Sequence, residues 1–183
     1  MKKNYLLAGI IAFCLLLAPA AGAQTYKNSF GVTLGSFNSL SYKSFLTDRL
    51  AAQLDLGFNL TATPATIHTK AGGVPVKATG DMSYWTFEFN PELLYQSTAW
   101  RGNGQLDWYL GAGLSLGLQE DWNITATQGK WGINAALGIE YIPSSVPFTF
   151  GLDFRPGYGM LFNNASYTSV FDWKLAAAIR YYF

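Results

Sequence analysis

The sequence predicts an all-β protein, namely an eight-stranded antiparallel up-and-down transmembrane β-barrel. Two observations carry this prediction: apolar and polar residues alternate with a period of two in segments along the chain, and an apolar leader with a small-residue cleavage site precedes them. The 183 residues are 50% hydrophobic and 13% charged, with a formal net charge of +1. This composition excludes a disordered chain and a basic nucleic-acid-binding surface.

The N-terminus is typical of a secretory signal peptide. Two lysines precede an apolar run from Leu6 to Leu17, and Ala21 and Ala23 form an Ala-x-Ala cleavage site. A retained anchor is the alternative, but the run is shorter than the roughly 20 apolar residues of a membrane helix. We therefore expect a signal peptide over 1–23 and one outer-membrane β-barrel domain over 24–183, without disulfides because Cys14 is removed.

Eight segments carry the period of two, which brings alternate side chains to one face of a strand. One face holds large apolar residues, and the other holds glycine, small and polar residues. Pro91 and Pro156 cannot donate a ladder hydrogen bond, so we expect them at bulges or strand ends. The predicted strands are 29–35, 39–47, 50–61, 83–95, 106–119, 130–141, 148–155 and 172–183.

The connections between these strands differ in length on the two sides. Those after the even-numbered strands are short, whereas those after the third, fifth and seventh strands are long; only the first connection, 36–38, breaks the trend. Short turns on the side of both termini and long loops on the other are typical of an outer-membrane barrel. The long loops are predicted at 62–82, 120–129 and 157–170.

The polar faces indicate a crowded interior. Seven glycines lie beside four acids and four bases, and so many charges are unusual on a solvent face otherwise poor in charge. We expect them to form a salt-bridge network inside the barrel. Its predicted members are Lys43, Asp55, Glu88, Glu140, Asp153, Arg155, Lys174 and Arg180.

The apolar faces carry aromatic residues near the strand ends, as expected of the girdles at a membrane interface. Two-sided strands also suit a soluble β-sandwich, or a lipocalin-like carrier whose apolar face points inward around a small hydrophobic ligand. The girdles favour the membrane barrel with its apolar face outward. Their predicted members are Trp85, Trp108, Trp131, Tyr141, Trp173, Tyr181 and Phe183.

The runs GINAALGIEYIPSSVPFTFGLDFRPGYG, WYLGAGLSLGL and IRYYF resemble small eight-stranded outer-membrane β-barrel proteins, with the closest likeness to OmpX-like barrels. The resemblance covers about 27–183. It implies a Gram-negative outer membrane, with lipid and lipopolysaccharide as surroundings and a monomeric state. It also implies that Ile179, Tyr181 and Phe183 form the sorting signal for the barrel-assembly machinery.

The sequence offers little for catalysis. Some barrels that modify lipopolysaccharide use a histidine with a serine two residues later, but His68 is followed by Thr69 and Lys70 and falls in a predicted loop. With one histidine and no mature cysteine, a metal site would need only oxygen ligands, and Glu120 and Asp121 look like a solvated face. We expect no enzyme activity, no cofactor and no metal; a lipopolysaccharide-modifying enzyme is the weakest alternative.

The inward charges either line a conduction path or plug the barrel. An eight-stranded barrel is just wide enough for its own side chains, and equal numbers of acids and bases produce no selectivity field, which favours the plug. We expect the long loops to make any surface contacts. Apolar residues in them are Ile67, Val74, Val76, Phe162 and Tyr167, and no motif identifies a ligand or a specific role.

Overall fold

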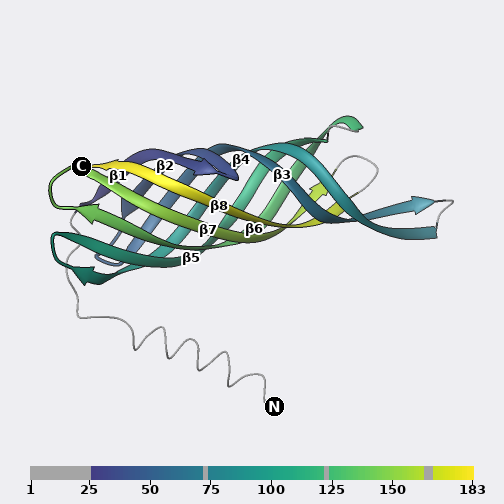
Figure 1. The fold of residues 1–183 in the computed structure, drawn as a ribbon. Coiled ribbons are helices and arrows are strands. Elements are labelled where there is room, and N and C mark those ends of the chain that lie inside the picture. Colours follow the sequence, from purple (N-terminus) through teal and green to yellow (C-terminus); the bar gives the residue numbers. More distant parts are fainter. Residues whose placement is uncertain (1–25, 72–73, 122–123, 163–166) are drawn as a thin grey trace, which may run out of the picture.

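The computed structural model describes residues 26–71, 74–121, 124–162 and 167–183, and their side chains outside 59–84 and 121–126. Antiparallel strands follow one another around a closed barrel in chain order, and β1 pairs with β8 to close it (Figure 1). The predicted eight-stranded barrel is confirmed. The strands are β1 Asn28–Gly35, β2 Phe37–Phe45, β3 Leu50–Ala71, β4 Val74–Arg101, β5 Gly104–Asp121, β6 Ile124–Pro143, β7 Phe148–Phe162 and β8 Tyr167–Tyr182.

The strands are longer than predicted at the end opposite the C-terminus. Segments 62–82, 120–129 and 157–170 were predicted as loops, but most of each continues as paired strand. The loop prediction was therefore wrong in extent. The apolar–polar alternation weakens there, yet a hairpin needs only continued backbone pairing, and residues such as Thr, Val and Ile favour the extended conformation.

The β1–β2 hairpin is much shorter than the β3–β4 hairpin. Strands β1 and β2 have 8 and 9 residues, whereas β3 and β4 have 22 and 28 and project beyond the rest of the barrel (Figure 1). Beyond β1 and β2, β3 pairs directly with β8. His68 therefore lies in strand β3, with its backbone opposite Lys77 and Tyr167, and not in the predicted loop.

Pro91 and Pro156 lie inside β4 and β7, so their predicted placement at bulges or strand ends was wrong. Pro91 stays in register with Leu54, and Pro156 with Trp173. On its other side each strand omits two ladder pairs around the proline, and the register resumes unchanged. Each proline is tolerated because its strand stays paired with the neighbour on one side, so the missing N–H interrupts only the ladder on the other side.

The apolar faces of the strands point outward and the polar faces point inward, as the aromatic girdles suggested. Large apolar side chains face outward, for example Phe30 at 49% exposure and Leu114 at 46%, while polar and charged side chains fill the interior. A lipocalin-like arrangement would turn the apolar face inward, so the structure excludes it. No helix among the described residues is long and apolar enough to cross a bilayer.

The interior is crowded enough to require glycine. A Cβ atom added to Gly138 would overlap the Tyr109 hydroxyl and the backbone oxygen of Leu152. Toward the end of the lumen near the C-terminus, buried apolar and aromatic residues form a cluster. Its buried members are Tyr26, Phe45, Ala51, Leu94, Tyr109, Ala136 and Ile142.

Candidate functional site: the charged lumen

The structure places all eight predicted charges inside the barrel. Their side chains are at most 4% exposed, and each takes part in at least one ion pair. The alternation of a strand explains this, because residues two apart point to the same face. They come from six strands: Lys43 on β2, Asp55 on β3, Glu88 on β4, Glu140 on β6, Asp153 and Arg155 on β7, and Lys174 and Arg180 on β8.

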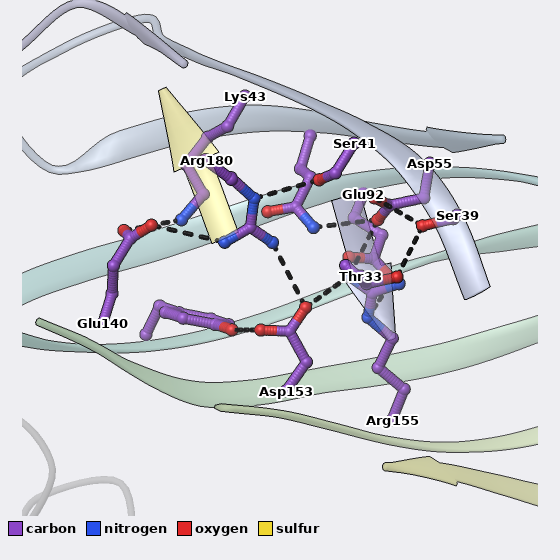
Figure 2. Close-up of polar contacts among 12 residues, drawn as sticks. Thr33, Ser39, Ser41, Lys43, Asp55, Glu92, Glu140, Asp153, Arg155 and Arg180 are labelled. Carbon is purple, nitrogen blue, oxygen red and sulfur yellow. Dashed lines mark hydrogen bonds and ion pairs between the residues drawn. The ribbon is translucent and has the colours of Figure 1, made fainter. Parts of the chain in front are cut away.

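Arg180 joins two carboxylates at the centre of the lumen (Figure 2). Its Nη1 lies 3.3 Å from Glu140 Oε1, and its Nη2 lies 3.2 Å from Asp153 Oδ2. Lys43 Nζ lies 3.0 Å from the other oxygen of Glu140. Charge-assisted hydrogen bonds of this kind are about twice as strong as neutral ones, so they hold these side chains in fixed positions.

Arg155 lies among three carboxylates. Its Nη2 is 2.8 Å from Asp55 Oδ2 and 3.0 Å from Asp153 Oδ2, and its Nε is 3.4 Å from Glu92 Oε1. Asn134 donates a hydrogen bond of 2.7 Å to the same Glu92 oxygen. We call the linked groups the inner tier: Lys43, Asp55, Glu92, Asp107, Glu140, Asp153, Arg155 and Arg180.

A second group of charges lies nearer the projecting hairpins. Glu88 accepts hydrogen bonds from Lys130 and Lys174, and Lys130 Nζ also lies 2.8 Å from Asp172 Oδ2. We call these four residues the outer tier. The buried ring of Phe37 lies between the tiers, with Lys174 Nζ 4.8 Å and Arg155 Cζ 5.6 Å from its centroid, so cation–π contacts connect the two groups.

Four buried charges were missed by the sequence prediction. Glu92, Asp107, Lys130 and Asp172 bring the described buried charges to seven acids and five bases, so the equal balance expected from sequence was wrong. Extending the alternation of inward and outward residues along each strand would have found all four. Glu92, for example, lies four residues after Glu88 on β4, and the register with β3 is unbroken through Pro91, so both side chains point into the lumen.

Tyr26 is a further lumen residue without a sequence signal, since it precedes β1. Its hydroxyl donates a 2.8 Å hydrogen bond to Glu140, and its ring stacks on Tyr182 at 5.1 Å and meets Phe45 edge-on at 5.4 Å. Burial, together with the Glu140 carboxylate, raises the pKa of the Tyr26 hydroxyl, which keeps it a hydrogen-bond donor. Tyr26 thus joins the lumen network at the end near the C-terminus.

The lumen carboxylates lie against donor groups of the same barrel. The lumen carboxylates bind ammonium, guanidinium and amide groups; for example, Asp107 accepts hydrogen bonds from Gln96 and Gln105. In the part of the chain that the structure describes, no group of three or more His, Cys, Asp or Glu residues could hold a metal ion. The side chain of His68 lies outside the described residues.

The predicted sorting residues share the outward face at the C-terminal rim. Ile179, Tyr181 and Phe183 are 43%, 48% and 61% exposed, and the rings of Tyr181 and Phe183 stack at 6.2 Å. Trp173 differs from its prediction, because the extension of β8 places it near the middle of the strand. The predicted cleavage residues Ala21 and Ala23 lie outside the described residues.

No protein-family model matches the chain, and no curated protein matches it. Among solved structures, the crystal structure of Neisserial surface protein A (NspA) is similar over 85% of this chain and 93% of that chain, with a TM-score of 0.52 and 15% identity. Ail, the attachment invasion locus protein of Yersinia pestis, covers 84% and 93%, with a TM-score of 0.27 and 12% identity. This chain therefore has the fold of the small eight-stranded outer-membrane β-barrels, as the sequence resemblance implied.

Proposed function

We propose that this protein is a non-enzymatic, monomeric barrel of the bacterial outer membrane that is exported by a cleaved signal peptide. Its lumen is plugged by its own charges, and its projecting hairpins act at the cell surface. The observation that carries the proposal is the combination of an outward apolar face with a lumen filled by buried ion pairs. Lipid would cover the outward apolar face, and the charges in the lumen pair with one another.

The plug is supported by the continuity of the two tiers. Within the inner tier, contacts run from Lys43 through Glu140, Arg180 and Asp153 to Arg155. Phe37 then connects Arg155 to Lys174 of the outer tier. Removing one partner of a buried ion pair costs about 3–5 kcal/mol, so a conducting path would have to break costly contacts. An eight-stranded barrel also has little width beyond its side chains.

The projecting β3–β4 hairpin supports a surface role. Pairing of β4 with β5 begins at Tyr84 opposite Asp121, whereas pairing of β4 with β3 already begins at Val74. Over residues 74–83 the described register therefore gives β4 a partner on one side. A strand edge of this kind presents backbone donors and acceptors to which an extended segment of a surface partner can add.

Membrane fractionation followed by conductance recordings tests the scaffold and the plug. Cells expressing the full chain should yield an outer-membrane band whose mobility shifts on boiling, and the purified protein should give no steady current in planar bilayers. The double variant Arg155→Ala/Arg180→Ala should conduct, whereas Lys27→Ala, at an exposed position, should not. A steady, ion-selective current from the wild type would contradict the plug, and a soluble product would contradict the scaffold.

Deletion of Phe183 tests the sorting signal. The truncated chain should accumulate without the heat-shifted band, because the terminal aromatic ring at the rim is lost. Phe148→Ala is the matched control, since it removes a ring that contacts Tyr181 at the same rim. Normal membrane insertion of the truncated chain would contradict this role for Phe183.

A further inference from the structure

A groove of about 470 Å³ crosses the outer wall of the barrel over β5, β6, β7 and β8, which lie side by side in Figure 1. Ala112, Ala135 and Pro156 follow one another across β5, β6 and β7 at matching register positions. All three face outward and are short. They form the bottom of a trough in the apolar wall.

In the register of the strands, rows of longer exposed side chains run on both sides of the three short residues, and Ile133, Tyr158 and Phe171 of one row line the trough. One neighbouring row crosses the same four strands with exposed residues Leu110, Leu137, Phe154 and Leu175. The other crosses them with Leu114, Ile133, Tyr158 and Phe171. Leu93 on β4 and Trp173 on β8 continue the row of short residues at its two ends, because they pair with Ala112 and Pro156.

Pro156 helps to create this shape. The β6–β7 ladder has pairs at Asn134↔Gly157 and at Leu137↔Phe154, and none between them. The proline ring supplies no N–H and little height above the sheet, and Gly157 and Asn134 form the floor beneath it. Adjacent strands lie about 4.8 Å apart, so the three short residues on neighbouring strands span about 10 Å from the first to the third.

The position of the trough along the membrane normal determines its occupant. Along β6, Ala135 lies six residues from Tyr141 and four from Trp131, both of which are exposed aromatic residues. At the usual strand rise and tilt these separations correspond to about 15 Å and about 10 Å along the membrane normal, which together match the apolar band of about 25 Å. The trough therefore opens into hydrocarbon.

We propose that the trough is a binding site for one acyl chain of a membrane lipid, which remains bound when the barrel is extracted. The lining is mostly apolar, contains no charged residue and is continuous with the lipid-facing surface. An unfilled trough would leave its lining atoms without contacts, and a flexible hydrocarbon chain restores them. The proposal rests on the membrane location proposed above.

Native mass spectrometry of the full-length barrel, extracted from outer membranes in mild detergent, tests the site. The wild type should retain one more lipid than Ala135→Phe, in which the added ring fills the trough, with the lipid-bound fraction falling about tenfold, equivalent to 1.4 kcal/mol. Ala112→Leu should act in the same direction. Ala177→Phe is the matched control, because Ala177 also faces outward but lies away from the trough, and it should retain the lipid.

A phospholipid with a photoreactive acyl chain, in proteoliposomes, locates the contact. Cross-links should concentrate on peptides that contain Ala135 and Pro156 in the wild type and disappear from them in Ala135→Phe. Equal lipid retention by all variants, or evenly spread cross-links, would overturn the proposal. A dimer lost in Ala135→Phe would assign the trough to a second copy instead. The heat-shifted band in each variant distinguishes failure of this site from failure of the membrane scaffold.

Discussion

The inner and outer tiers of the lumen both bury carboxylates beside cations, but they differ in the cations they use. The outer tier pairs two lysines with two acids, whereas the inner tier places Lys43, Arg155 and Arg180 among five acids. A guanidinium presents five donors in a planar fork and an ammonium is a compact charge, so arginine can hold several carboxylates at once. Arg155 contacts three of them. The inner tier therefore depends on the geometry of its donors, and the outer tier depends on charge balance.

The largest expected effect comes from Glu140→Ala in the inner tier. Five side chains donate to this carboxylate, and removing it leaves two buried cations, Lys43 and Arg180, without it. We expect a loss of about 3–5 kcal/mol in the free energy of unfolding, measured by denaturant titration in lipid. The donors are Tyr26, Lys43, Gln96, Thr149 and Arg180.

Glu88→Ala is the matched change in the outer tier, and it should cost less, because Asp172 still lies near both lysines. Equal losses in the two variants would contradict the distinction between the tiers. Glu140→Gln serves as the conservative control, since the amide keeps one hydrogen-bond acceptor but loses the charge. It should fall between the wild type and Glu140→Ala.

Arg155→Lys tests the role of geometry at constant charge. An ammonium cannot reach Asp55, Asp153 and Glu92 together, so we expect a loss of about 1–3 kcal/mol in unfolding free energy, the scale of a hydrogen bond to a charged group. Denaturant titration would measure it. Unchanged stability would mean that charge alone holds the inner tier together.

Asp107→Asn should have the smallest effect. Asp107 is held by amide hydrogen bonds from Gln96 and Gln105, and it adds to an inner tier that already has more acids than bases. Asparagine keeps an acceptor and removes a negative charge, so unfolding free energy should change by less than about 1 kcal/mol. A loss as large as that of Glu88→Ala would show that Asp107 balances a cation.

Much of the fold could be predicted because the strand period is local. Residues 50–61 or 130–141 show by themselves which side chains share a face, and this was enough to place Asp55 and Glu140 inside the barrel. The extents of the strands could not be predicted in the same way. Backbone pairing continues into Thr- and Ala-containing segments where the alternation fades, as in β3 up to Ala71.

The sequence by itself determined that the strands have two unlike faces and that eight of them follow in order, because alternation is a property of neighbouring residues. Only the tertiary structure decided which charges meet, since Arg155 on β7 reaches Asp55 on β3 and Glu92 on β4 across the closed lumen. It likewise decided that Tyr26 binds Glu140 and that Ala112, Ala135 and Pro156 line up as a trough. Both outcomes depend on register and closure, which bring together residues far apart in the chain.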